Sequence, residues 1–185
     1  DVSEWAHSIH VQGSYAYVTD ETPALYIIDI SNPRKPSLVG YCATQQDSYA
    51  ENSDVYVLGN YAYMVVSSLG VRDLFYVIDV SNPEKPSIIS NRPLSARGVH
   101  VSGRYAYVVN VTGLQVIDIS NPKLPRIVGS CDTPGSASGV YVLGSYTYIA
   151  DGSTGLQVID ISNPKLPRIV GSCDTPGYAV DVHVS

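Results

Sequence analysis

The sequence predicts an all-β protein, a β-propeller built from four-stranded antiparallel blades of about 40 residues. One observation is composition: the chain has 15 Tyr but only one Phe, one Trp and one Met. Tyr, together with Val and Ile, favours strands over helices. The other is repetition, because Asp-(Ile/Val)-Ser-Asn-Pro recurs at Asp29, Asp79, Asp118 and Asp160. Four strands in each repeat of about 40 residues are typical of propeller blades.

A second repeated marker fixes the number of units. Gly-x-Tyr-x-Tyr starts at Gly13, Gly59, Gly103 and Gly144. The last two units share one identical segment, found at Gly113–Gly135 and again at Gly155–Gly177. We therefore expect a single propeller domain over 1–185, with blades at about 6–46, 52–93, 96–134 and 137–175.

The third unit shows how each blade divides into strands. Its expected strands are Gly98–Ser102, Tyr105–Asn110, Leu114–Ser120 and Arg126–Cys131. A tight turn at Gly103 joins the first two, and Pro122 stops the third because proline lacks the N–H that a ladder needs. We find no stretch of ten or more residues with helical periodicity. The Asp of each repeat is interpreted as a structural fastening of its turn, because a catalytic acid is needed only once.

The C-terminal segment, residues 178–185, is expected to contain a surplus inner strand at Val180–Ser185. Four blades plus one strand predict a piece of a larger propeller, because exposed strand edges need partners. The alternative is that the strand completes a neighbour or replaces the first strand. Self-association or a partner chain could then use it.

The repeat resembles a known family. Leu-Gln-Val-Ile-Asp-Ile-Ser-Asn-Pro, with Gly-x-Tyr-x-Tyr-(Val/Ile) upstream, is similar to the LVIVD repeat of bacterial and archaeal secreted or surface-attached propellers. The resemblance covers all four units and is loosest in the second. It implies the propeller architecture and an extracellular, cell-surface or periplasmic location. It brings no shared catalytic motif.

The loops divide into two sets. The constant-face loops are the first-to-second turns and the third-to-fourth Ser-Asn-Pro loops, which scarcely vary. The variable-face loops are the second-to-third loops and the blade connections, which change in length and are therefore the expected binding face.

Charge is divided between the same two sets of loops. Twelve of the 17 acids map to variable-face loops: Asp1, Glu4, Asp20, Glu21, Asp47, Glu51, Asp54, Asp73, Asp132, Asp151, Asp174 and Asp181. Eight of the 11 bases map to constant-face loops: Arg34, Lys35, Lys85, Arg104, Lys123, Arg126, Lys165 and Arg168. This layout could orient a charged partner, or it could serve only solubility.

The composition argues against nucleic acid as a general partner and against a membrane-spanning helix. The net charge of −6 argues against a general nucleic-acid binder, which needs a basic face. No apolar run is long enough to span a membrane as a helix.

The blade connections supply the candidate binding residues. These are Trp5, His7, Tyr49, Glu51, Asp54, Arg97, Tyr178 and Asp181. Aromatic rings among carboxylates suit sugars, cationic peptides or a hard cation. Asp54 and Asp181 could together bind Ca²⁺, but no Asp-x-Asp-x-Asp-Gly loop supports this, and capping of their own turns is the favoured interpretation. No catalytic residue, metal site or required cofactor is predicted.

Two further side-chain types recur at equivalent positions. His10, His100 and His183 share one inner-strand position with Tyr56 and Tyr141, and we expect structural histidines between blades rather than metal ligands. Cys42, Cys131 and Cys173 share one outer-strand position, too far apart for an intramolecular disulfide. We expect three semi-buried thiols, with an intermolecular bridge as the alternative.

These observations favour a non-enzymatic interaction scaffold that engages a protein or a carbohydrate through its acidic loops. One alternative is a fragment of a metal-dependent propeller hydrolase or lyase with its site at the channel mouth. Another is a structural subunit of a larger assembly.

Overall fold

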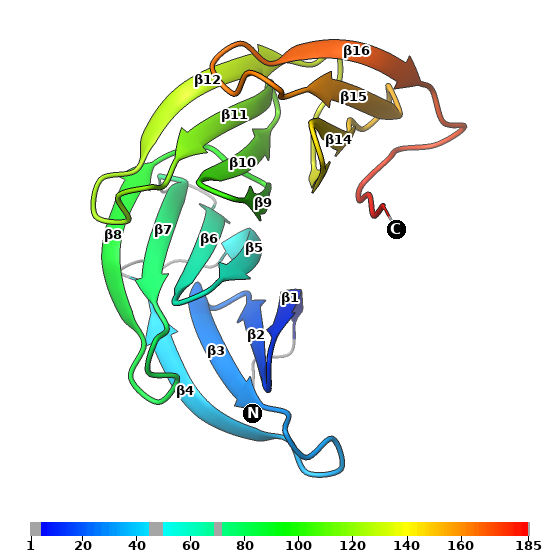
Figure 1. Ribbon diagram of the computed structural model, residues 1–185. Coiled ribbons are helices and arrows are strands. Elements are labelled where there is room, and N and C mark those ends of the chain that lie inside the picture. Colours follow the sequence, from blue (N-terminus) through cyan, green and yellow to red (C-terminus); the bar gives the residue numbers. More distant parts are fainter. Residues whose placement is uncertain (1–4, 45–49, 69–71, 185) are drawn as a thin grey trace. The chain divides into compact units, whose positions relative to one another are not determined.

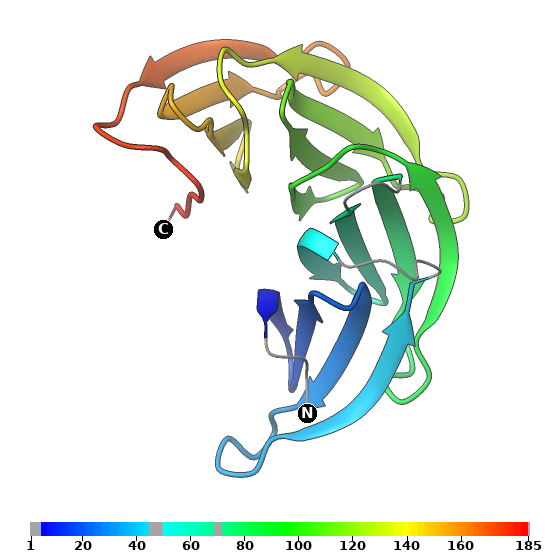
Figure 2. The same ribbon diagram turned by 180° about the vertical axis from the view of Figure 1, so that it is seen from behind.

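The structure is a computed structural model that describes residues 5–44, 50–68 and 72–184, without the side chains of residues 51 and 52. It is all-β, and the chain divides into two compact units, Asp1–Ser95 and Ala96–Ser185. Each unit holds two four-stranded antiparallel sheets, the blades of a propeller fold, with the strands of each sheet side by side in chain order (Figures 1 and 2). Within the part of the chain that the structure describes, no helix is long and apolar enough to cross a bilayer.

The strands follow the repeats. The first unit contains β1 (Ala6–Gln12), β2 (Tyr15–Asp20), β3 (Ala24–Asp29) and β4 (Ser37–Ala43), then β5 (Ala50–Leu58), β6 (Tyr61–Ser68), β7 (Leu74–Asp79) and β8 (Ser87–Pro93). The second contains β9 (Gly98–Ser102), β10 (Tyr105–Asn110), β11 (Gly113–Asp118) and β12 (Arg126–Asp132), then β13 (Gly139–Leu143), β14 (Tyr146–Ala150), β15 (Leu156–Asp160) and β16 (Arg168–Cys173). The four sheets confirm the predicted fold class.

The tight turn between the first two strands depends on glycine. Gly103 has φ +58°, in the left-handed region, and Ser102 pairs with Tyr105 across the turn. Only glycine adopts this conformation without a steric cost, which explains why the marker begins with it. The register then places Tyr105 opposite Asp118 and Tyr107 opposite Val116 on the next strand.

The Asp-x-Ser-Asn-Pro turn is a hydrogen-bonded structure, as predicted for the repeated Asp. In the third sheet, the Asp118 carboxylate accepts the Ser120 N–H at 2.9 Å, and the Asn121 side chain accepts the Lys123 N–H at 3.1 Å. The same pair of bonds recurs in all four sheets. These Asx turns fasten the loop and hold its next residues at fixed positions.

The outermost strand of every sheet contains an irregularity that the sequence did not predict. In the third sheet, Val116 pairs with Gly129 and Ile117 pairs with Ile127, so Val128 is an extra residue on β12. Equivalent register shifts occur in the other three sheets. A bulge of this kind bends and twists its strand.

Within each unit, the two sheets pack face to face. In the second unit, Leu114 and Val116 of one sheet pack in a core with Val140 and Ile149 of the next. Gly129 on β12 lies so close to the next sheet's loop that an added Cβ would be 2.2 Å from the Pro164 carbonyl oxygen. Gly40 repeats this close approach in the first unit, where an added Cβ would overlap the Pro83 carbonyl oxygen. The glycine on the outer strand therefore allows the neighbouring Ser-Asn-Pro loop to pack directly against the strand backbone.

The C-terminal segment differs from the prediction. Residues 180–184 form no strand, and the segment is tied to the fourth sheet through a single bridge between Ala179 and Gly152. The Val180 carbonyl oxygen nevertheless lies against Gly139, just as the Ser138 carbonyl oxygen lies against Gly98 one blade earlier. The segment thus occupies the place of a following inner strand. It is not assigned as a strand because residues 180–184 form no ladder with any described strand.

Candidate functional site

The predicted binding residues fall into two groups, one in each unit. Trp5, His7 and Asp54 belong to the first unit, and Arg97, Tyr178 and Asp181 belong to the second. The other two candidates, Tyr49 and the side chain of Glu51, lie outside the described residues.

In the first unit, polar side chains cross-link the inner strands of the two sheets. His7 Nδ1 and Ser53 Oγ hydrogen bond at 3.1 Å, and the neighbouring Ser8 hydroxyl donates to the Asp54 carboxylate. Ser53 is buried and its hydroxyl lies 3.3 Å from the Asp20 carbonyl oxygen, which it can donate to. A serine nucleophile must reach its substrate, so this arrangement suits fastening rather than acyl transfer.

Trp5 lies next to this cross-linked pair and is open to solvent. It precedes β1, and 64% of its surface is exposed. Its carbonyl accepts the Glu21 N–H at 3.2 Å, which ties the segment to the end of β2. The ring is thus presented on a backbone that is itself held in place.

In the second unit, Tyr178 takes the exposed aromatic role. It is 58% exposed, and its ring lies so close to Gly152 that a Cβ there would be 2.7 Å from the ring. Arg97, at the entry to β9, donates to the Ser136 hydroxyl at 3.0 Å. As in the first unit, an exposed ring accompanies a charged group that is engaged in a hydrogen bond.

The two aspartates considered as Ca²⁺ ligands each accept the N–H of the next residue, and Asp54 lies within β5 rather than in the turn where the capping interpretation had placed it. Asp54 accepts the Val55 N–H at 2.8 Å, and Asp181 accepts the Val182 N–H at the same distance. Among the described residues, no three His, Cys, Asp or Glu side chains are grouped so that they could hold a metal ion. The donor set that Ca²⁺ requires, six or more oxygens, is not provided by these two carboxylates.

The recurring histidines pack against tyrosines, as the structural interpretation predicts. The His10 and Tyr56 rings lie 4.3 Å apart in the first unit, and Tyr141 lies between His100 at 4.7 Å and His183 at 4.8 Å in the second. Burial lowers the pKa of His10. A histidine ring packed on a tyrosine ring is thus a structural element between neighbouring sheets.

The cysteines are free, but they are not equally buried. Cys42 is buried, Cys131 is partly buried and Cys173 is exposed. The expectation of three semi-buried thiols is therefore wrong for Cys173. Its sequence context is identical to that of Cys131, but the face that carries it is open to solvent in the fourth sheet.

Two of the acids assigned to the exposed variable-face loops are instead fully buried. Asp20 ends β2 and Asp151 directly follows β14, and neither is exposed to solvent. Asp151 accepts hydrogen bonds from the Thr133 hydroxyl at 2.6 Å, the Gly135 N–H at 2.8 Å and the Thr154 hydroxyl at 2.6 Å. It joins the end of the third sheet to the fourth, which is a structural role that its sequence position did not indicate.

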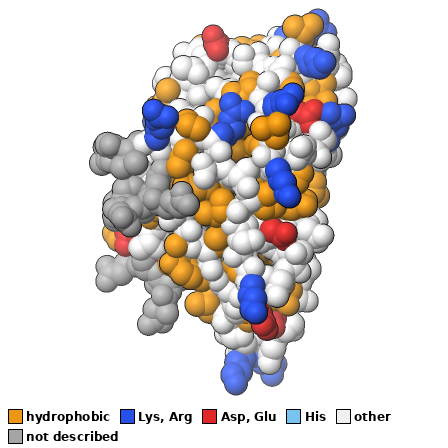
Figure 3. Space-filling model, turned by 90° about the vertical axis from the view of Figure 1, so that its left-hand side faces the viewer, with side chains coloured by type: hydrophobic (Ala, Val, Ile, Leu, Met, Phe, Trp, Pro, Cys, Tyr) orange, Lys and Arg blue, Asp and Glu red, His pale blue; other side chains and the backbone are white. Residues whose placement is uncertain are grey.

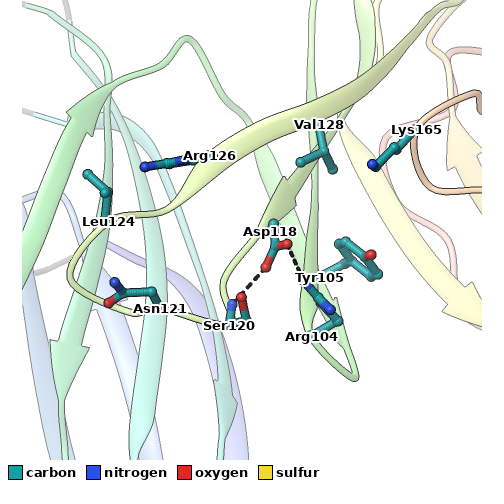
Figure 4. Close-up of a pocket in the computed structure, with 9 residues that line it drawn as sticks. All are labelled: Arg104, Tyr105, Asp118, Ser120, Asn121, Leu124, Arg126, Val128 and Lys165. Atoms are coloured by element: carbon teal, nitrogen blue, oxygen red, sulfur yellow. Dashed lines mark hydrogen bonds and ion pairs between the residues drawn. The ribbon is translucent and has the colours of Figure 1, made fainter.

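A pocket that the sequence did not indicate lies on the constant-face side of the second unit. Its volume is about 500 Å³, and its lining includes three cationic side chains, Arg104, Arg126 and Lys165, and one carboxylate, Asp118 (Figure 4). Arg104 forms an ion pair with Asp118 and stacks over the Tyr105 ring at 5.4 Å. Lys and Arg side chains are prominent among hydrophobic ones on the face shown in Figure 3, so the chain exposes positive charge locally despite its net charge of −6.

The Asp118 carboxylate has the pKa most affected at this pocket. Hydrogen bonds from Ser120 and then from Arg104 lower its pKa to about 2. If Arg104 is replaced by serine, the residue at this turn in the first and fourth units, we expect the pKa of Asp118 to rise. It should stay below 3.8, the ordinary value, because Ser120 still donates.

Carboxylate ¹³C shifts measured against pH check this expectation. A carboxylate with a lowered pKa stabilises the fold above its unfolded value, near 3.8, and this contribution is lost as the pH falls toward 2. In the Arg104→Ser variant this contribution should be smaller, and its loss should be complete at a higher pH. The pKa of Asp29, in the other unit, serves as the internal control. An unchanged pKa at Asp118 contradicts the role assigned to Arg104.

Comparison with known proteins identifies the repeat and the fold. The sequence profile of the LVIVD repeat matches residues 5–44, 51–92, 95–133 and 134–175. No match was found among curated protein sequences.

Two solved structures share the fold. A periplasmic gluconolactonase from Pseudomonas aeruginosa is 15% identical with a TM-score of 0.75, over 94% of this chain and 55% of that chain. A functionally unknown protein from Desulfotomaculum acetoxidans is 14% identical with a TM-score of 0.81, over 98% of this chain and 60% of that chain. The chain thus spans little more than half the length of each. At these identities the likeness shows the fold alone.

Proposed function

Because this chain belongs to the LVIVD-repeat family, whose repeat covers nearly all of it, we propose that it is a non-enzymatic interaction scaffold. It is exported or lies at the cell surface, and it engages a protein or a carbohydrate through its variable-face loops. The observation that carries the proposal is that each unit exposes a large aromatic ring on a blade connection, Trp5 or Tyr178, and that the same connections carry hydrogen-bonded polar groups. Rigidly held aromatic rings offer apolar contact area at a low entropic cost.

The location rests on two indications. The repeat resembles those of secreted or surface-attached propellers, and one of the solved structures with the same fold is a periplasmic protein. The free cysteines are compatible with export because their positions on separate sheets prevent an intramolecular bridge.

The single tryptophan provides a direct test of this proposal. Trp5 is the only tryptophan in the chain, so its fluorescence reports on the first unit's loops. We expect a saturable change on titration with a neutral oligosaccharide panel or with a lysine-rich peptide. Calorimetry should then show binding weakened by about tenfold in Trp5→Ala or Tyr178→Ala, the loss typical of an interface anchor.

A matched control separates this role from a general loss of aromatic surface. Tyr41, on β4, is 54% exposed but lies on an outer strand rather than on a variable-face loop. Tyr41→Ala should leave binding unchanged. The proposal is contradicted if neither probe gives a saturable signal or if all three variants weaken binding equally.

An enzymatic role is the second candidate, in the form of a fragment of a propeller hydrolase or lyase. It is favoured by one observation, that a solved structure with this fold is a lactonase. Gluconolactone hydrolysis faster than the spontaneous reaction would support it. A metal requirement would be revealed by loss of that activity on addition of a chelator.

A structural subunit is the third candidate, and it is favoured by the open face of the fourth sheet. Val170 on β16 is 51% exposed, whereas its counterpart Val128 on β12 is partly buried against the hydrophobic core of the second unit. A monomeric chain at high concentration in sedimentation experiments would argue against this candidate.

A further inference from the structure

The pocket on the constant-face side of the second unit has cationic groups that are not used by the fold. Of its three cations, Arg104 is paired with Asp118. The charged side-chain groups of Arg126 and Lys165 form no hydrogen bond or ion pair with any described residue, and both residues are exposed. Two positive charges in one concave site thus lack a counter-charge.

The second unit itself explains why Arg126 is unpaired. In the fourth sheet, the equivalent arginine, Arg168, pairs with Asp160 at 3.1 Å. In the third sheet, the equivalent carboxylate, Asp118, is paired with Arg104, which extends from the β9–β10 turn. Arg104 therefore takes the partner that Arg126 would have, and leaves the second guanidinium at the pocket.

The first unit has the same loop docking with different side chains at the three positions. Its two sheets dock in the same way, since Gly40 meets Pro83 as Gly129 meets Pro164. The positions of the three cations are there occupied by Ser14, Ser37 and Glu84. The docking of two sheets therefore needs no positive charge at these positions, and the three cations of the second unit are an addition to the packing.

We propose that this pocket binds a tetrahedral oxyanion, a phosphate or sulfate group carried by a small ligand or a polymer. Three cations and one carboxylate leave two positive charges, which match a doubly charged group. The cations come from the β9–β10 turn, the start of β12 and the β15–β16 loop (Figure 4). A tetrahedral group directs its oxygens toward several sides, whereas a carboxylate directs two oxygens in one plane. Arginine matches such oxygens with paired N–H donors, and Asn121 and Ser120 add polar groups at the same rim.

The site is separate from the loops of the proposed function. It lies on the constant-face side, and none of the residues that line it is among the candidates Trp5, His7, Arg97, Tyr178 or Asp181. A failure of carbohydrate or protein binding at the loops therefore leaves this inference standing, and the reverse also holds.

The test uses inorganic phosphate and inorganic sulfate as probes, with chloride at matched ionic strength as the reference. We expect saturable shifts of the arginine Nε–H NMR signals of Arg104 and Arg126 with either tetrahedral anion. Lys165→Glu, which installs the residue found at this position in the first unit, should weaken this binding by about tenfold because a charge beside the anion is reversed. The combined variant with Arg104→Ser and Arg126→Ser should abolish it.

Lys123→Glu is the matched control. Lys123 occupies the equivalent loop position in the third sheet and carries the same charge, but it does not line the pocket. The Lys123→Glu variant should bind phosphate as tightly as the unsubstituted chain does. Equal weakening in Lys123→Glu and Lys165→Glu, or shifts that grow linearly without saturation, would overturn the proposal. Malonate binding as tightly as phosphate would overturn the assignment to a tetrahedral anion.

Discussion

Replacing Gly129 by alanine is expected to lower the free energy of unfolding by about 3 kcal/mol, the upper part of the range for overpacking. A methyl group there would be 2.2 Å from the Pro164 carbonyl oxygen and 3.1 Å from the Lys165 backbone. The obstructing atoms are backbone, which cannot rotate away. The fourth sheet must therefore shift from the third, which would open the core that contains Val116 and Ile149.

Gly171→Ala is the control for this prediction. Gly171 lies in a segment of identical sequence, but a Cβ there would meet only Val158, at an ordinary 3.8 Å. Its effect should stay within about 0.5 kcal/mol. Urea unfolding of both variants, compared at equal m-values, measures the difference. Equal destabilisation by the two substitutions would show that the lower free energy of unfolding comes from strand propensity and not from the packing of the Pro164 loop against Gly129.

Replacing Asp151 by alanine is expected to cost a similar amount, about 3 kcal/mol, because it leaves polar groups without a partner. The carboxylate is fully buried and accepts from Thr133, Gly135 and Thr154. Without it, two hydroxyls and one backbone N–H lose their acceptor. Two of these donors belong to the connection that leads from the third sheet to the fourth, so that connection should loosen.

Hydrogen exchange and thermal unfolding together test this second prediction. The Gly135 amide should lose its protection in Asp151→Ala before the strand amides do. Asp174→Ala is the control, because Asp174 is exposed and its side chain has no hydrogen bond with a described residue. It should leave the melting temperature unchanged. A melting temperature for Asp151→Ala equal to that of the unsubstituted chain would contradict the role of the carboxylate in holding this connection in place.

Much of the fold was predictable because the same strand and turn markers occur in four successive units. The predicted strands Gly98–Ser102 and Tyr105–Asn110 agree with β9 and β10 residue by residue. These boundaries were readable because glycine at the turn and proline after the third strand act through local backbone geometry. The Asx turns at Asp118 and its counterparts were predictable for the same reason.

The candidate site was less predictable because it depends on which sheets meet. The exposed rings of Trp5 and Tyr178 lie where blade connections were expected, and their neighbours His7 and Arg97 are held by side chains 46 and 39 residues away. Arg104, Arg126 and Lys165 were recognised only as bases on constant-face loops. One local signal was present, since Arg104 occupies a turn position that is Ser or Asn in the other units. The bulge at Val128, which has no marker in the sequence, was not foreseen.

The identical segments Gly113–Gly135 and Gly155–Gly177 separate what each level determined. The sequence by itself determined their strands, turns and register, which are the same in both sheets because they follow from local conformational preferences and alternation. Only the tertiary structure decided that Val116 and Cys131 are covered while Val158 and Cys173 are more open, and that Arg126 is unpaired while Arg168 is paired. Burial and pairing belong to a residue's neighbours, and two identical segments with different neighbours therefore present different chemistry.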